Sequence, residues 1–339
     1  MEKRVSIIVT AFNRKEFIID ALKSIERQTI DKSLFEVIFF RNFEDETLNK
    51  SFETKGWIKT FIPSNNNIGN WLAEGILAAK GDVICFLDDD DLYHPQRLEK
   101  ILFLFDRYED IALIRNDIII FSHFDKITFD TLDYSCNNFK IFWSAHNIGE
   151  IARLVRKSAA LNLSSIAIRK SLFSDSIKGL DDLVTGPDFF MLYSCIASGN
   201  GIALLDEKLS YYRIHESTVH SKSDDLDRVI EKELNYGMLF TFALDVSMKP
   251  LALKSSNFSL LRFISYQESA WRVRDFMISR NGRITFRALC EALVYSLIKF
   301  DIVILIGVIF GLLKRIGIIS SDFYLKIRKI TLIKNGLVP

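Results

Sequence analysis

The sequence predicts an α/β fold with a mostly parallel central sheet flanked by helices, followed by a helical C-terminal extension that associates with a membrane. Three observations lead to this prediction. Short β-branched, apolar runs alternate with segments of helical periodicity over residues 1–120, as expected for parallel strands joined by right-handed crossovers. A row of four aspartates directly follows one of these runs, and the C-terminal region is both apolar and basic. A chain of 339 residues can form two domains, and we place them at 1–220 and 221–339.

The first 108 residues contain the clearest alternation of strands and helices. We expect strands at 5–10, 35–40, 58–62 and 83–87, and helices at 17–25, 70–79 and 97–108. Ligands of such sheets bind beyond the carboxyl ends of the strands. Because three of the strands end at Thr10, at Arg41-Asn42 and at Asp88, we expect these residues to meet at one edge of the sheet.

The middle of the chain is less regular. Its strand-like segments are 112–114, 118–121, 165–168 and 201–205, its helix-like segment is 188–198, and an exposed helix is expected at 221–235. The four cysteines (Cys85, Cys136, Cys195 and Cys290) are scattered without ligand spacing. We therefore expect reduced core thiols and neither a disulfide nor a zinc framework.

The four aspartates in a row, Asp88, Asp89, Asp90 and Asp91, follow an apolar strand. Like charges this close raise one another's pKa unless a cation lies among them. A hard divalent cation, Mg²⁺ or Mn²⁺, is the obvious candidate because it takes carboxylate and phosphate oxygens. The alternative is a helix cap, with Asp91 preceding a helix that begins at Pro95. One aspartate suffices for a cap, so the row favours the metal site.

The C-terminal region from Lys249 onward carries fifteen Lys or Arg and five acids, which leaves the first 248 residues with a net charge of −9. Twelve apolar residues, Ile302–Leu313, stand at its centre, fewer than the roughly twenty that a membrane span needs. A longer segment would include Lys299 and Asp301, which are costly within a bilayer. We expect residues 289–319 to associate peripherally, or by shallow insertion, with the cytoplasmic face of a membrane. A buried core helix is the alternative, and no nucleic-acid partner is expected.

Four segments, in this order and spacing, resemble family 2 glycosyltransferases, which are inverting enzymes of the GT-A fold. The resemblance covers residues 4–216, and its D-x-D motif falls within the aspartate row. The segments are Val5–Arg14, then Asn67–Gly69 followed by Ala79–Asp91, then Gly186–Phe190 and Tyr211–His215.

The resemblance implies a metal-dependent hexosyl transfer from a nucleotide-sugar donor to a lipid-linked or glycan acceptor. It implies Asp188 as the catalytic base, with Asp181 and Asp182 as competing carboxylates, although Asp188 could equally cap a helix. It implies Asp90 and His215 as contacts to Mg²⁺ or Mn²⁺, and leaves Arg213 to pair with a phosphate or with an acid of the sheet. The implied nucleotide-sugar contacts are Thr10, Phe12, Asn13, Arg14, Asn42, Asn67, Asp88 and Asp89, of which Asn67 could instead be a turn residue and Phe12 ordinary core.

The sequence departs from the family where the nucleotide base is read. The family usually has an aspartate after the second strand, whereas this chain has Arg41-Asn42. The Asn42 amide offers both a donor and an acceptor to a base edge, and Arg41 remains a second candidate. The departure also leaves open a non-catalytic, nucleotide-binding or scaffolding membrane protein as the alternative function.

Overall fold

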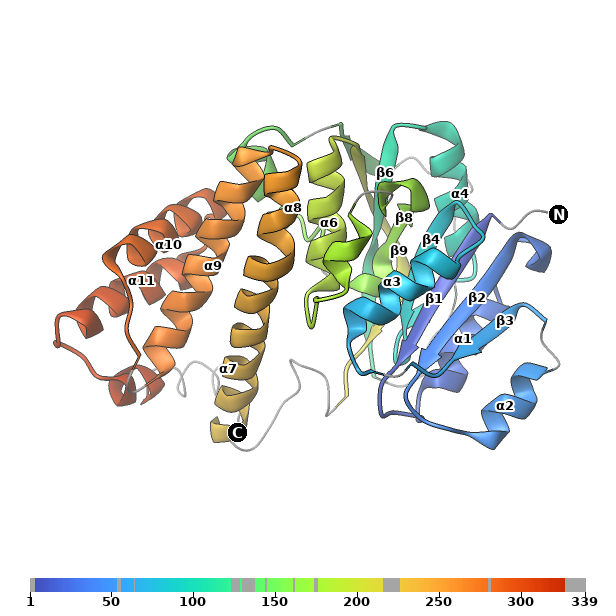
Figure 1. Cartoon of the computed structure of the whole chain (residues 1–339), viewed down its shortest axis with the longest axis horizontal. Helices are drawn as coiled ribbons and strands as arrows, with labels where there is room; N and C mark the ends of the chain where they lie inside the picture. The colour runs from blue at the N-terminus through green and yellow to red at the C-terminus, as the bar shows by residue number, and fades with distance from the viewer. Residues whose placement is uncertain are drawn as a thin grey trace. The chain divides into compact units, whose positions relative to one another are not determined.

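The computed structural model describes residues 4–53, 56–63, 65–122, 129, 138–143, 145–160, 162–173, 176–215, 226–279 and 282–326. The chain divides into two compact units (Figure 1). The first unit comprises residues 1–145, 158–183 and 187–213, and the second comprises 146–157, 184–186 and 214–339.

The first unit is built on one mixed sheet with the strand order β3-β2-β1-β4-β8-β6-β9-β5, and β7 pairs with β9. Pairing is parallel along β3-β2-β1-β4 and between β6 and β9, whereas β8 runs antiparallel to both of its neighbours. The strands are β1 (Val5–Ala11), β2 (Phe35–Arg41), β3 (Ile58–Phe61), β4 (Val83–Asp88), β5 (Leu92–Tyr93), β6 (Ile111–Phe121), β7 (Phe139–Phe142), β8 (Ile166–Arg169) and β9 (Gly201–Arg213).

Helices cover both faces of this sheet, and the alternation of side chains along β1 shows how. Val5, Ile7 and Val9 belong to the core that α1 and α4 close. Ile8 points to the opposite face, where it lies close to Gly75 of α3. The α/β class that the sequence predicts is therefore confirmed. The helices of this unit are α1 (Ile18–Glu26), α2 (Glu46–Glu53), α3 (Ile68–Ala78), α4 (Arg97–Arg107) and α6 (Pro187–Ser198).

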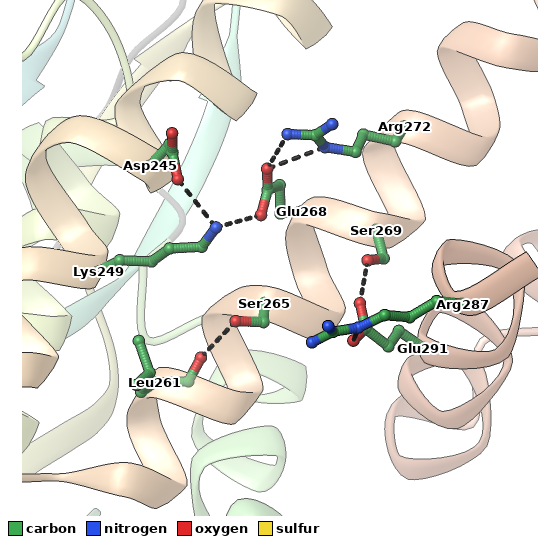
Figure 2. A network of polar contacts seen from close by, with 9 residues as sticks. All are labelled: Asp245, Lys249, Leu261, Ser265, Glu268, Ser269, Arg272, Arg287 and Glu291. Carbon is green, nitrogen blue, oxygen red and sulfur yellow. Dashed lines mark hydrogen bonds and ion pairs between the residues drawn. The ribbon is translucent and has the colours of Figure 1, made fainter. Parts of the chain in front are cut away.

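The second unit is helical and is organised around α9, which packs on α5, α7, α8, α10 and α11. A polar network fixes its core (Figure 2). The buried Glu268 of α9 accepts hydrogen bonds from Lys249 (2.5 Å) and from Arg272 (Nε, 2.9 Å), while Ser269 donates to Glu291 of α10 (2.6 Å). The helices are α5 (Ile148–Arg156), α7 (Leu226–Ala243), α8 (Lys249–Lys254), α9 (Phe258–Ile278), α10 (Phe286–Lys299) and α11 (Ile302–Arg315), with a π-helical turn at Leu244–Met248.

Several expected elements differ in extent. The strand-like segments 112–114 and 118–121 form one strand, β6, with irregular pairing near its centre. The expected helix at 221–235 corresponds to α7, which continues to residue 243, and residues 221–225 lie outside the described part. The segment 289–319 is broken into two helices at Phe300. No helix in the described ranges is long and apolar enough to cross a bilayer.

The cysteines agree with the expectation of free thiols where they can be seen. Cys85 and Cys195 are buried and Cys290 is exposed, all three as free thiols. Cys136 lies outside the described residues.

Candidate active site

The carboxyl ends of β1, β2 and β4 meet at one edge of the sheet, as the sequence predicts. In the register of the sheet, Thr10 is opposite both Phe40 of β2 and Asp88 of β4. The Thr10 hydroxyl donates to Asp88 Oδ1 (3.4 Å), and the Thr10 carbonyl accepts from the Asp89 amide (3.1 Å). Thr10 therefore holds the start of the aspartate row (Asp88–Asp91) in place.

Arg14 supplies a cation within the aspartate row. Its Nε donates to Asp89 Oδ2 (3.0 Å), and its Nη2 pairs with Asp89 and with Asp90 Oδ2 (2.7 Å). Burial by itself would lower the Arg14 pKa, but the hydrogen bond to Asp89 and the charges of Asp90, Asp89 and Asp88 raise it above its ordinary value. The electrostatic conflict seen in the sequence is thus partly resolved within the chain.

Asp91 is a structural residue, but not as a helix cap. It accepts hydrogen bonds from Asn162 Nδ2 (2.9 Å) and from the Arg213 amide (3.1 Å). The short strand β5 follows it, and α4 begins only at Arg97 after Gln96. The cap interpretation is therefore wrong, because this carboxylate instead ties the aspartate row to β9. Burial, followed by the charge of Asp90, raises the pKa of Asp91 to about 7.

Asp88 ends β4 beside three other carboxylates. Burial first, then the charges of Asp91, Asp90 and Asp89, raise its pKa well above the ordinary value, and only Arg14 opposes them. Tyr212, for which the sequence predicted no role, is also influenced by the charges of these aspartates. Burial and the nearby aspartates raise the pKa of Tyr212 to about 12, so it stays protonated and can donate a hydrogen bond.

The structure separates Arg41 from Asn42. Asn42 Oδ1 accepts from the Asn13 amide (2.8 Å), and its Nδ2 donates to the Oδ1 atoms of Asn13 (2.8 Å) and Asn66 (3.3 Å). Arg41 is only 2% exposed and its Nη2 bonds Asn49 of α2. Because successive strand residues point to opposite faces, Asn42 lies with Asn13 at the sheet edge while Arg41 is buried toward α2.

Phe12 and Asn67 border this edge in different ways. Phe12 is 49% exposed, and its ring centre lies 6.0 Å from that of Trp71, so it is not ordinary core. Asn67 caps α3 by accepting from the Gly69 amide (2.9 Å), and its Nδ2 donates to the Asp181 carbonyl (2.8 Å). Asn67 thus fixes the segment that leads toward α6.

Asp188 lies in the first turn of α6, which begins at Pro187. It is therefore inside the helix and not at the N-cap position. Its Oδ1 accepts from the Phe189 amide (3.0 Å). Burial raises the pKa of Asp188 to about 7, although hydrogen bonds from the backbone of Phe189 and of Asp188 itself oppose the shift. The competing carboxylates Asp181 and Asp182 are exposed. Asp188 has the proton affinity that suits a base near neutral pH.

Arg213 at the end of β9 joins three parts of the first unit. Its Nε donates to the Asp90 carbonyl (2.9 Å) and its Nη2 pairs with Asp20 of α1 (3.1 Å). It therefore pairs with an acid beside the sheet, one of the two alternatives that the sequence left open. His215 follows two residues later and belongs to the second unit, so its predicted metal contact stays a prediction.

The residues of the aspartate row fit a divalent ion that is shared with a substrate. Within the described ranges, no three His, Cys, Asp or Glu side chains are grouped as they would be around a metal held by protein alone. Asp88 and Asp90 offer two carboxylates, and Mg²⁺ commonly uses one or two carboxylates together with substrate phosphates. Because burial and the neighbouring carboxylates raise the pKa of Asp88, a bound cation would stabilise its ionised form.

The comparisons with known proteins agree with this architecture. The sequence model of glycosyl transferase family 2 matches residues 6–163, which include β1 from its second residue, β4 and the aspartate row. An uncharacterized glycosyltransferase of Nostoc sp. is 23% identical over 289 residues, covering 80% of this chain and 85% of the relative. The chain is a glycosyltransferase, and its residues 6–163 match family 2.

Two further matches describe the fold and the local likeness of this glycosyltransferase. The crystal structure of Staphylococcus aureus TarS in complex with UDP-GlcNAc matches with a TM-score of 0.53 at 15% identity, covering 93% of this chain and 92% of that one. This match supports the GT-A fold. Poly(ribitol-phosphate) beta-N-acetylglucosaminyltransferase TarP of S. aureus is 32% identical over 105 residues, which is 29% of this chain and 32% of TarP.

Proposed function

We propose that the enzyme transfers a hexosyl group with inversion of the anomeric carbon, using Asp188 as the base and the aspartate row as the diphosphate site. The observation that supports this most directly is the convergence of β1 and β4, which sets Arg14 against Asp89 and Asp90. A guanidinium fixed by two carboxylates at a strand end is a preorganised group for an anionic donor. Because TarS was crystallised with UDP-GlcNAc, this compound is the first donor to test.

In the proposed site, Asp90 and Asp88 would hold Mg²⁺ or Mn²⁺. When bound, the ion would stabilise the negative charge of the departing diphosphate. Arg14 keeps Asp89 and Asp90 in place for this task. Tyr212, protonated throughout the neutral range, offers a hydrogen-bond donor close enough to feel the charges of the row.

Asp188 acts on the acceptor. A carboxylate with a pKa of about 7 is ionised in roughly half of the molecules at neutral pH and accepts a proton readily. The acceptor hydroxyl attacks the anomeric carbon, its proton goes to Asp188, and the bond from the sugar to the diphosphate breaks. A single displacement of this kind inverts the anomeric centre.

The nucleotide base is proposed to lie between Phe12 and Asn42. The exposed Phe12 ring provides a stacking surface, and Asn42 is held by Asn13 and Asn66 so that its amide is oriented. This arrangement replaces the aspartate usual in the family with a neutral amide. The burial of Arg41 toward α2 and its bond to Asn49 favour Asn42 over Arg41 for this role.

The acceptor is proposed to be a lipid-linked or glycan substrate at the cytoplasmic face of a membrane, with residues 289–319 at the lipid interface. The helices α10 and α11 of this segment expose many large apolar side chains. Such a surface is unusual for a protein that meets only water.

The decisive experiment measures UDP release from UDP-GlcNAc and from a panel of other sugar nucleotides, with Mn²⁺, with Mg²⁺ and with a chelator. The variants Asp90→Asn and Asp188→Asn should each lose at least about a hundredfold in rate, as expected for loss of charge stabilisation or of a general base. Asp182→Asn is the matched control, because this carboxylate is exposed and six residues from Asp188. Full activity of Asp188→Asn together with loss in Asp182→Asn would overturn the assignment of the base.

A further inference from the structure

The turn between α10 and α11 presents four large apolar side chains to solvent. Leu297, Phe300, Ile302 and Val303 are each more than half exposed, and Phe300 reaches 84%. We call these four residues the hairpin tip. They lie within seven positions of the chain, at the end of one helix and the start of the next. Single exposed apolar residues are normal, but a cluster of this kind marks an interaction surface.

The backbone of the hairpin tip is already hydrogen-bonded within the chain. The Phe300 amide donates to the Leu297 carbonyl (3.2 Å), and the Asp301 amide donates to the Ser296 carbonyl (2.9 Å). The Asp301 carboxylate accepts from the Val303 and Ile304 amides, both at 3.1 Å. Unpaired backbone groups are costly in lipid. This turn can therefore leave water without exposing these donors.

Phe300 adopts a backbone conformation that is unfavourable for a phenylalanine. Its φ of 53° is left-handed, and helix ends in this conformation usually carry Gly or Asn. A left-handed backbone is unfavourable for an L-residue that carries a side chain. Since the ring is almost fully exposed, packing within the chain offsets little of that cost. A contact between the Phe300 ring and a partner outside the chain would explain why a phenylalanine occupies this position.

Cations border the hairpin tip. The Arg156 guanidinium of α5 lies 5.0 Å from the centre of the Phe300 ring and donates to the Ile298 carbonyl. Arg153 and Lys157 are exposed beside Arg156, and Lys299 precedes Phe300 in the chain. The nearby Asp301 carboxylate is used in capping α11. An apolar tip with basic residues around it matches the interface of a bilayer that contains anionic lipid.

We propose that the hairpin tip inserts into the interface of an anionic phospholipid bilayer while the cations of α5 bind headgroup phosphates. This inference rests on the membrane association proposed above and names its contact surface and its lipid class. It also assigns a role to α5, which lies in sequence more than 130 residues before the apolar segment that predicts membrane association. A second copy of the chain is the competing occupant.

The test uses the full chain and co-sedimentation with phosphatidylcholine vesicles that contain or lack phosphatidylglycerol. The wild type should bind the anionic vesicles. Phe300→Asn suits the left-handed backbone and should fold at least as stably. It should weaken vesicle binding by roughly tenfold or more, because the phenylalanine side chain that would be buried in the bilayer is lost. Phe242→Asn is the matched control, because Phe242 is a half-exposed phenylalanine of α7; it should bind as the wild type does.

The electrostatic part is tested with Arg156→Gln and Lys157→Gln. Each should weaken binding to the anionic vesicles by roughly fivefold and leave binding to phosphatidylcholine unchanged. Equal vesicle binding by Phe300→Asn and the wild type would overturn the proposal. It would also be overturned if the wild type bound no vesicles and formed a dimer that Phe300→Asn converts to a monomer. UDP release by Phe300→Asn without vesicles should match the wild type. A loss of binding with intact donor cleavage therefore separates this proposal from the proposed reaction.

Discussion

The substitution Asp188→Asn should stabilise the fold while it removes the proposed base. The Asp188 pKa is raised from 3.8 to about 7 by burial. A carboxyl group that keeps its proton more tightly in the folded state than in the unfolded state makes stability fall as pH rises between the two pKa values. The wild type should therefore lose free energy of unfolding from about pH 4 to about pH 7 and then level off. Asparagine carries no charge and removes this loss.

The size of the effect follows from the difference in pKa. About three pKa units at 1.36 kcal/mol each give a ceiling of about 4 kcal/mol. Asp188 keeps partial contact with solvent, which screens its charge, so we expect about 2–4 kcal/mol at pH 8.5 and almost no difference at pH 4. Asparagine can still accept the hydrogen bond that the Phe189 amide donates to Asp188 Oδ1, so the local geometry is retained.

The assay is urea unfolding of the wild type and Asp188→Asn at several values of pH from 4 to 8.5, paired with UDP release at the same values. Asp182→Asn controls for the general effect of removing one carboxylate. In the wild type, kcat/KM should rise with pH through about 7 as the base loses its proton. A difference in unfolding free energy between the wild type and Asp188→Asn that stays constant over this range would refute the burial argument. A rate unaffected by the substitution would refute the catalytic role.

Three other substitutions test the site. Arg14→Gln should lower UDP release at least about tenfold and destabilise the fold by about 1–3 kcal/mol, because it leaves the charges of Asp89 and Asp90 without their partner; an unchanged urea midpoint would contradict this. Gly69→Ala should destabilise by about 2 kcal/mol or more, because its Cβ would lie 1.9 Å from the Leu180 carbonyl oxygen; a stable, active variant would show that the 180–183 segment moves freely. Asn42→Ala should weaken UDP binding by calorimetry about fivefold, the value of one hydrogen bond, and wild-type affinity would exclude Asn42 from the base site.

Part of the candidate site was predictable because it depends on local sequence and on strand direction. Buried β-branched runs define β1, β2 and β4, and parallel strands bring their carboxyl ends to the same edge. The meeting of Thr10, Asn42 and Asp88 follows from that geometry alone. The division of work among the aspartates could not be predicted, because it depends on partners distant in sequence. Asn162 and Arg213 hydrogen-bond to Asp91, and no sequence pattern near residue 91 indicates either partner.

The sequence by itself determined the fold class, the edge of the sheet where the chemistry lies, and the basic, apolar character of the C-terminal region. These depend on periodicity and composition, which are properties of short segments. Only the tertiary structure decided that Arg14 neutralises part of the aspartate row, that Arg41 is buried while Asn42 is presented, and that Phe300 breaks the apolar segment into two helices. Such outcomes depend on which side chains meet across the fold, and burial and charge act through those contacts.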